Sequence, residues 1–139
     1  MPYDPQNVFA KIISGELPCI KLYEDEQTLS FMDIMPQTEG HALVIPKEGA
    51  AMIFDLSPAS LAATILTTQK IATAVRKALE VPGVLIAQAN GEAAMQSVPH
   101  LHFHVIPRRE GETMRFHAAV HEDREKLELL AAKIIAALE

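Results

Sequence analysis

Three histidines alternate with apolar residues late in the chain, in the segment that runs from His100 through His102 and His104 to Ile106. Its apolar, partly β-branched character predicts a strand, and side chains in a strand alternate between two faces. The three imidazoles therefore share one face, and the apolar residues between them face the core. Imidazoles this close depress one another's pKa, so at least one should be neutral near pH 7. A nucleophile or a metal ligand requires that neutral state.

Two chemical roles compete for these histidines. A lone strand histidine is most often structural, but three in strict alternation favour a site. A metal is one candidate ligand, because histidines at positions i and i+2 commonly share an ion. The flanking residues, Ser97 before the segment and Arg108-Arg109 after it, offer hydroxyl and guanidinium groups instead. Those groups suit an anion such as phosphate better than a cation.

The chain that must position these residues has the length of one domain. It contains 139 residues, with 18 acidic against 12 lysine and arginine and a formal charge of −6. Nucleic acids and anionic membrane surfaces need a basic footprint, so neither is an expected partner. The only cysteine, Cys19, excludes an intrachain disulfide and fits a reducing compartment. The start, MPYDPQNVFAK, lacks the pattern of a signal peptide, and the apolar run 129–138 is too short to span a bilayer. We expect a cytoplasmic protein.

Turn and cap residues divide the chain into short strands and three helices. Asp4-Pro5 predicts the start of the first helix, and Ser57-Pro58 predicts the start of the longest one. That longest helix carries apolar residues on more than one side, including Leu66 and Ile71, which indicates a second burial surface. The strand patterns fall at 19–33, with a turn at 24–26, and at 41–45, 84–89 and 100–106; the last helix falls at 123–138. The mixture predicts an α+β fold around an antiparallel sheet.

The segment from Gln96 to Ile106 resembles the signature of the histidine triad (HIT) superfamily. Residues 9–18, 23–25, 31–34 and 40–47 resemble other segments of that family in the same order. The resemblance predicts a HIT domain at 4–109 and a divergent C-terminal extension at 110–139 that ends in an amphipathic helix. It implies a HIT-like α+β fold, with an antiparallel sheet of about five strands and flanking helices, that forms a homodimer.

The resemblance also implies a hydrolase of nucleoside monophosphates joined to a leaving group, with a purine phosphoramidate as the expected substrate. His102 would be the nucleophile that forms a nucleotidyl-histidine intermediate, with its other ring nitrogen held by a backbone carbonyl. His104 would contact phosphate oxygens or the leaving group, and His100 would support the phosphate pocket. Ser97 matches a hydroxyl that contacts the phosphate or the leaving group.

The remaining expected site residues bind the substrate. His41 would complete a cluster of four histidines, and Asp33 would accept hydrogen bonds from the ribose hydroxyls. Phe31 and Ile34 would form apolar walls around the base. Asn90 and Gln96 match polar positions near the phosphates. Neither a metal nor a cofactor is expected. Asn7 and Ala10 stand where some bacterial members carry a zinc-binding Cys-x-x-Cys, so that structural zinc site should be absent.

One further departure from the family concerns Met95, which stands where many relatives have glycine just before the glutamine of the signature. A side chain there is expected to narrow the pocket or move the loop. Three alternatives to phosphoramidate hydrolysis stay open: cleavage of dinucleoside polyphosphates, non-catalytic nucleotide binding, and a metal site made by the three histidines. The other two histidines, His117 and His121, have no assigned role.

Overall fold

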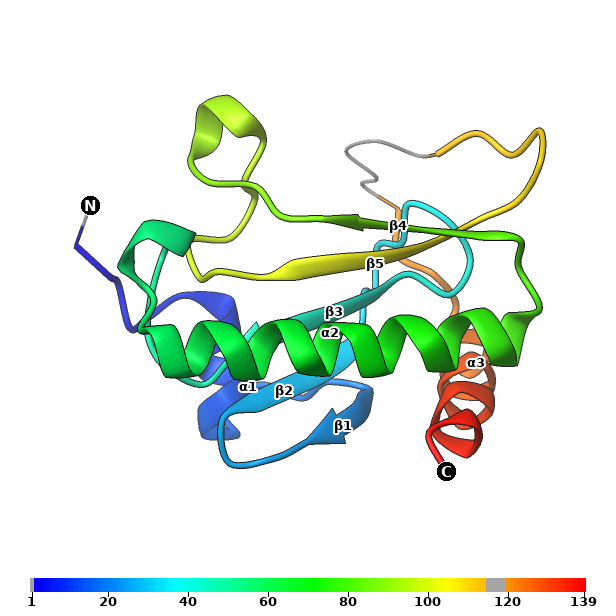
Figure 1. Ribbon diagram of the computed structural model, residues 1–139, viewed down its shortest axis with the longest axis horizontal. Coiled ribbons are helices and arrows are strands. Elements are labelled where there is room, and N and C mark those ends of the chain that lie inside the picture. The colour runs from blue at the N-terminus through cyan, green and yellow to red at the C-terminus, as the bar shows by residue number, and fades with distance from the viewer. Residues whose placement is uncertain (1, 115–119) are drawn as a thin grey trace.

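Five strands form one antiparallel sheet in the order β1-β2-β3-β5-β4 (Figure 1). The structure is a computed structural model that describes residues 2–114 and 120–139. The strands are β1 (Lys21–Glu24), β2 (Thr28–Met32), β3 (Ala42–Pro46), β4 (Gly83–Ala87) and β5 (Phe103–Arg108). This architecture confirms the expected α+β class and the number of strands. Within those described ranges, no helix combines the length and the apolar character needed to cross a bilayer.

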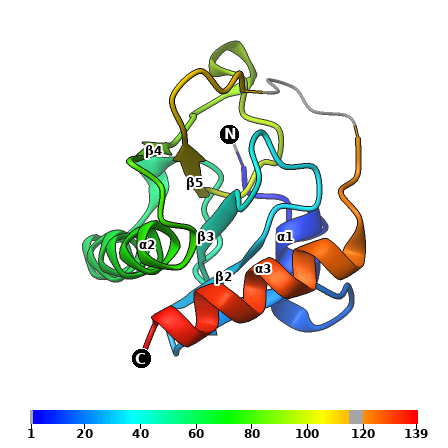
Figure 2. The same ribbon diagram turned by 90° about the vertical axis from the view of Figure 1, so that its right-hand side faces the viewer.

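Three α-helices pack against this sheet: α1 (Val8–Ser14), α2 (Pro58–Leu79) and α3 (Arg124–Ala137). Figure 2 shows α1 and α2 on opposite sides of the sheet. Two short 3-10 turns, η1 (Ile53–Asp55) and η2 (Glu92–Ala94), lie in the loops that follow β3 and β4.

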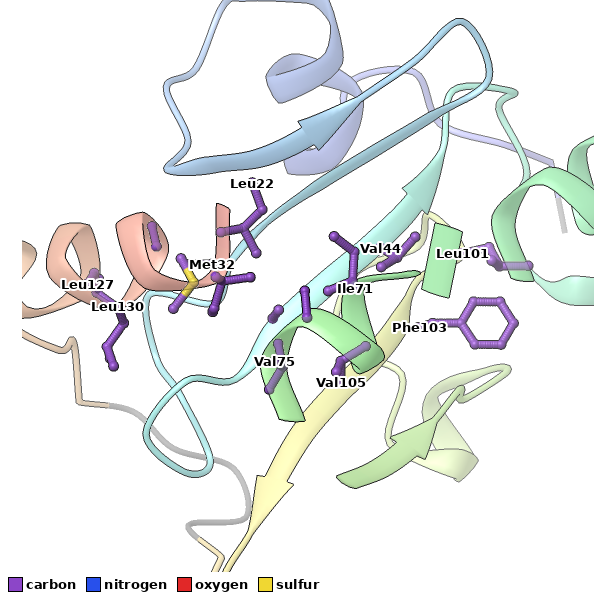
Figure 3. Packing of buried hydrophobic residues seen from close by; sticks show 14 of the residues in the cluster. Leu22, Met32, Val44, Ile71, Val75, Leu101, Phe103, Val105, Leu127 and Leu130 are labelled. Atoms are coloured by element: carbon purple, nitrogen blue, oxygen red, sulfur yellow. The ribbon is translucent and has the colours of Figure 1, made fainter. Parts of the chain in front are cut away.

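The main hydrophobic core lies between the sheet and the pair α2 and α3. Figure 3 shows Ile71 and Val75 of α2 beside Val44 and Val105 of the central strands. Leu101 and Phe103 join Val105 in this cluster, as strand alternation predicts for the residues between the histidines. On the opposite face, α1 covers a smaller cluster of Phe9, Leu29, Phe31, Leu43 and Ile45. The central strands are therefore buried on both faces, which explains the unbroken apolar sequence of β3.

The first helix begins later than its sequence pattern predicts. Asn7, not Asp4, is the N-cap, and its side-chain oxygen accepts a hydrogen bond from the Ala10 amide at 2.9 Å. The Asn7 amide group donates to the Asp4 carbonyl at 2.7 Å, so the segment before the helix is a turn. Asparagine and aspartate are about equally good caps, and these local hydrogen bonds of Asn7 choose between them. The start of α2 after Ser57, with Pro58 in its first turn, is as predicted.

The apolar residues of α2 face two sides, as expected, but only one side is covered. Ile71 is fully buried, whereas Leu66 is 63% exposed and Ile65 is 46% exposed. Threonines contribute much of the covered side: the hydroxyls of Thr64 and Thr68 donate to carbonyls one turn earlier, at 2.6 and 2.8 Å. These bonds satisfy the hydroxyls inside the helix, so threonine is tolerated in the core.

Candidate active site

The strand that carries the histidines begins at Phe103, so only His104 of the three lies within β5. His100 lies in a bend, and Leu101 and His102 lie outside the strand. The Leu101 amide donates to the Ala50 carbonyl at 2.8 Å instead of pairing with β3. This corrects the expected strand at 100–106. His100 therefore lies outside the sheet, beneath the N-terminal segment that carries Tyr3.

His100 is fully buried, and both of its ring nitrogens have partners. Nε2 lies 2.8 Å from the carbonyl oxygen of Pro46, and Nδ1 lies 2.6 Å from the hydroxyl oxygen of Tyr3. A carbonyl can only accept, so Nε2 carries the proton. Burial lowers the pKa of His100, which keeps the ring neutral and leaves Nδ1 to accept from the Tyr3 hydroxyl.

His102 has one ring nitrogen held and the other free of any hydrogen bond in the described structure. Its Nδ1 lies 2.7 Å from the carbonyl oxygen of His100, so the proton resides on Nδ1 and the lone pair on Nε2. The ring of Phe9 packs edge-on against it, with 5.0 Å between ring centroids. Burial lowers the pKa of His102 to about 4, against the opposing effect of the carbonyl hydrogen bond. At pH 7 His102 is thus a neutral imidazole with a nucleophilic Nε2.

His104 is oriented through His41. The amide of Gln37 donates to Nδ1 of His41 at 3.0 Å, so the proton of a neutral His41 must be on Nε2. That Nε2 lies 2.9 Å from Nδ1 of His104, which therefore accepts and keeps its own proton on Nε2. Burial, then the neighbouring His104 and His102, lowers the pKa of His41 to about 3; burial also lowers that of His104.

The four histidines therefore form a neutral cluster in which main-chain groups select the tautomers. The rings of His102 and His104 lie 4.9 Å apart, centroid to centroid. One presents a lone pair and the other presents an N–H. This pairing can attack an electrophilic centre while donating a hydrogen bond to an oxygen or to a leaving atom on that centre.

Asp33 lies beside His41, near the same ring nitrogen, Nε2, that faces His104. Its Oδ1 accepts from the Met35 amide at 2.9 Å, and its Oδ2 lies 3.6 Å from Nε2 of His41. Burial raises the pKa of this carboxyl to about 6. Its environment is thus unlike that of an exposed turn aspartate, whose carboxyl would be ionised well below neutral pH.

Donor atoms of Asp33, His41 and His104 all lie within 4.8 Å of one another, a spacing that a metal ion could bridge. The hydrogen bond from Gln37 argues against this use, because it places a proton on the nitrogen of His41 that would have to bind the ion. The alternative of an ion shared by the three triad histidines also fits poorly. Both ring nitrogens of His100 are already occupied by protein groups.

A family model described as "HIT domain" matches residues 14–111. The chain belongs to the HIT family. The adenosine 5'-monophosphoramidase hnt1 of Schizosaccharomyces pombe is 45% identical over 101 residues, which cover 73% of each chain. The adenosine 5'-monophosphoramidase HNT1 of Saccharomyces cerevisiae is 36% identical over 138 residues, covering 98% of this chain and 85% of the yeast protein.

A solved HIT structure matches the whole fold. The crystal structure of a HIT-like protein of Bartonella henselae, described as involved in cell-cycle regulation, superposes with a TM-score of 0.91 at 46% identity. The match covers 98% of this chain and 99% of that one. It therefore includes α3 as well as the segment that the family model matches.

Within the HIT signature, Gln96 fastens the loop that precedes the triad. Its Oε1 accepts from the Gly91 amide at 2.6 Å, and its Nε2 donates to the carbonyls of Ala51 and Val98 at 2.7 and 2.9 Å. Both amide protons are thereby used. Gln96 thus links the loop 91–98 to residue 51, and its expected substrate contact stays a prediction.

Asn90 and Ser97, the other two polar residues expected near the phosphates, differ in how far their side chains are used in hydrogen bonds within the protein. The Oδ1 of Asn90 accepts from the Ile53 amide at 2.7 Å and from Gln88 at 2.8 Å, while its Nδ2 donates to Gln88 at 2.8 Å. One proton of Nδ2 remains available. Ser97 is exposed, so its side chain can reach a ligand.

Met95 of this HIT chain adopts the left-handed conformation, with φ 69° and ψ 29°, at the end of η2. That conformation suits glycine, which is the residue expected here in many HIT relatives. Its side chain is 60% exposed. Met95 is therefore a strained residue on an exposed loop. Because its side chain is exposed, it can be accommodated without narrowing the pocket or moving the loop.

The two expected base walls differ in exposure. Phe31 is packed against Phe9, with 5.4 Å between ring centroids, and is only 3% exposed. Ile34 is 44% exposed and immediately follows Asp33. Ile34 thus offers most of the exposed apolar surface, whereas Phe31 belongs to the smaller hydrophobic cluster.

Two residues that orient the HIT histidines had no sequence signal. Gln37 acts through its main chain, and Tyr3 lies 97 positions from its partner. Of the histidines left unassigned, His121 is exposed and His117 lies outside the described residues.

Proposed function

We propose that this HIT protein hydrolyses nucleoside 5'-monophosphates whose phosphorus carries an amine or another leaving group, with purine nucleosides preferred. The observation that carries this proposal is the state of His102: neutral, held at Nδ1 by the His100 carbonyl, with Nε2 free. The two fungal relatives named adenosine 5'-monophosphoramidases support an adenosine phosphoramidate as the substrate to test.

The reaction proceeds by two displacements at phosphorus. In the first, Nε2 of His102 forms a bond to phosphorus, the bond from phosphorus to the leaving group breaks, and the amine departs with its electron pair and takes up a proton. The imidazole becomes cationic when Nε2 is bonded to phosphorus, and the Nδ1–H bond to the His100 carbonyl stabilises that charge. In the second, water forms a bond to phosphorus and gives up a proton, the phosphorus–Nε2 bond breaks with its electron pair returning to Nε2, and the nucleoside monophosphate leaves.

Neighbouring donors stabilise the charge that develops on the phosphoryl oxygens and on the leaving atom. His104 directs its Nε2–H away from His41, because its Nδ1 already accepts the hydrogen bond from that residue. Ser97 adds a hydroxyl from the exposed signature loop, and Asn90 adds its remaining amide proton. His100 supports the pocket by presenting the carbonyl that holds His102.

The nucleoside binds beside Asp33. The carboxylate accepts hydrogen bonds from the two ribose hydroxyls, and Ile34 packs against the base with Phe31 beneath it. His41, between Asp33 and His104, joins the nucleoside end of the site to the leaving-group end. Although burial raises the pKa of Asp33 to about 6, the carboxyl is mostly ionised at pH 7 and can accept both bonds.

A homodimer is the second part of the proposal. The strand β4 is at the edge of the sheet, and its Leu85 and Ile86 are 40% and 45% exposed. Leu66 and Ile65 of the neighbouring helix α2 are exposed as well. An apolar edge strand beside an apolar helix face favours association, and a second copy of this chain, pairing β4 with β4, would cover both.

The domain limits and location are also proposals. Residues 4–109 are proposed as the catalytic unit, in the cytoplasm, and residues 110–139 as an extension. Within the extension, Leu127, Leu130 and Ile134 of α3 are buried in the main core. The extension is therefore expected to be needed for stability.

Turnover of adenosine 5'-phosphoramidate, compared between the wild type and His102→Ala, tests the function. Wild-type turnover with loss of at least about 10⁴-fold in the variant, and with binding of adenosine monophosphate retained, is the expected result. Faster cleavage of dinucleoside polyphosphates than of phosphoramidates would replace the proposed substrate. Nucleotide binding without any turnover would indicate a non-catalytic module.

A further inference from the structure

The N-terminal segment reaches the triad through one side chain. The Tyr3 hydroxyl oxygen lies 2.6 Å from Nδ1 of His100, and the two rings pack edge to face, with centroids 5.5 Å apart and planes at 65°. Tyr3 precedes the part of the chain that matches the HIT model, which begins at residue 14.

Neighbouring residues hold the contact between Tyr3 and His100 in place. Gly49 has no side chain where a Cβ would come within 2.7 Å of the Tyr3 ring, so the ring occupies space that another residue would fill. Asn7 holds the carbonyl of Asp4 at 2.7 Å, which fixes the chain immediately after Tyr3. Phe9, two residues further, packs against the rings of both His100 and His102.

We propose that Tyr3 is a positioning residue for the nucleophile, a role that rests on the proposed function of His102. The Tyr3 hydroxyl donates to Nδ1 of His100, and Nε2 of His100 donates to Pro46. The ring is thus held at both nitrogens. The main-chain carbonyl of His100 accepts from Nδ1 of His102 and selects the tautomer of His102. Tyr3 therefore acts on Nε2 of His102 through His100, without touching the substrate.

Removing the hydroxyl leaves the buried Nδ1 of His100 without its donor, and an unsatisfied buried acceptor is costly. The ring is then free to shift or to exchange its proton between nitrogens, and the carbonyl that aligns His102 shifts with it. A part of the population then carries the His102 proton on Nε2, the nitrogen that must attack. That part is inactive, so turnover falls while substrate affinity does not change.

The test is Tyr3→Phe, which keeps the ring in its packed position, against Tyr23→Phe as the matched control. Tyr23, on β1, donates to Asp25 Oδ2 at 3.1 Å and has no contact with the triad among the described hydrogen bonds. For Tyr3→Phe we expect kcat on adenosine 5'-phosphoramidate to fall about tenfold, equal to about 1.4 kcal/mol, with KM unchanged. The control should keep the wild-type kcat and KM.

Long-range proton–nitrogen NMR of the histidine rings provides a readout that needs no substrate. The proposal predicts an Nδ1-protonated His102 in the wild type and in Tyr23→Phe, and a mixture of tautomers in Tyr3→Phe. Unchanged kcat with an unchanged His102 tautomer overturns the proposal, even if the unfolding temperature falls, because the contact is then only structural. A raised KM with unchanged kcat also overturns it. If the wild type shows no turnover, the proposed function fails while the NMR comparison still decides the role of Tyr3.

Discussion

Nε2 of His41 lies 2.9 Å from Nδ1 of His104, and the amide of Gln37 occupies the other nitrogen of His41. A single main-chain N–H therefore decides which nitrogen of His104 carries a proton. In a neutral cluster this choice matters, because His104 can donate toward the substrate only if Nδ1 is the accepting nitrogen. The same hydrogen bond reduces the suitability of His41 as a metal ligand.

Removal of the His104 donor should affect poor leaving groups most. An alkylamine depends strongly on hydrogen bonding as it departs, whereas a nitrophenolate carries its own charge well. His104→Ala should lower kcat/KM about 10²-fold for an alkyl phosphoramidate and less than about tenfold for a nitrophenyl ester of the same nucleotide. His41→Ala should also lower kcat/KM more for the alkyl phosphoramidate than for the nitrophenyl ester, but by smaller factors. Equal losses on both substrates would instead assign His104 to ground-state phosphate binding.

The pH dependence of kcat/KM should show two acid limbs. As pH falls through about 6, Asp33 becomes protonated and loses its capacity to accept from both ribose hydroxyls, so KM rises. As pH falls further through about 4, His102 becomes protonated and its lone pair is lost, so kcat falls. Asp33→Asn should abolish the limb near 6 and keep the one near 4. A wild-type profile with the lower limb alone would contradict ribose binding by Asp33.

The conformation of Met95 predicts an unusual response to glycine. Glycine in ordered structure normally costs about 0.5–1 kcal/mol, but the left-handed backbone of Met95 costs a similar amount for any residue with a Cβ. Met95→Gly should therefore leave the free energy of unfolding within about 1 kcal/mol of wild type. The β-branched Met95→Val should destabilise by about 1–2 kcal/mol. Urea denaturation measures both, and greater stability of the valine variant would contradict the strain.

The proposed dimer predicts different outcomes for two exposed apolar residues. Ile86 on the edge strand β4 is 45% exposed, and Leu129 on α3 is 67% exposed. Ile86→Glu would place a charge against its symmetry mate and should convert the protein to a monomer in light scattering. Leu129→Glu, outside the proposed interface, should leave the dimer intact. A wild-type monomer, or dissociation by the α3 variant alone, would refute this interface.

The parts of the fold that depend on local pattern were predictable. Alternation placed Leu101 and Phe103 in the core, and Ser57-Pro58 marked the start of α2. The family resemblance supplied the number of strands. Each of these features follows from residues close together in the chain or from a motif shared with relatives.

The parts that depend on distant contacts were not predictable. The start of β5 is delayed because the Leu101 amide bonds to Ala50. Gln96 matches a polar position near the phosphates in the sequence, but its hydrogen bond to the distant Ala51 carbonyl has no signal there. The tautomers of His100 and His41 depend on Tyr3 and on the Gln37 amide, and no spacing in the sequence indicates either partner.

The central claim, that His102 attacks phosphorus and is later displaced by water, is tested most directly by the stereochemistry at phosphorus. The substrate is one diastereomer of an adenosine 5'-phosphorothioamidate, hydrolysed in water enriched in ¹⁸O, and the configuration of the product is measured. Two in-line displacements predict retention. Inversion would show a single direct attack by water and would contradict the covalent role of His102.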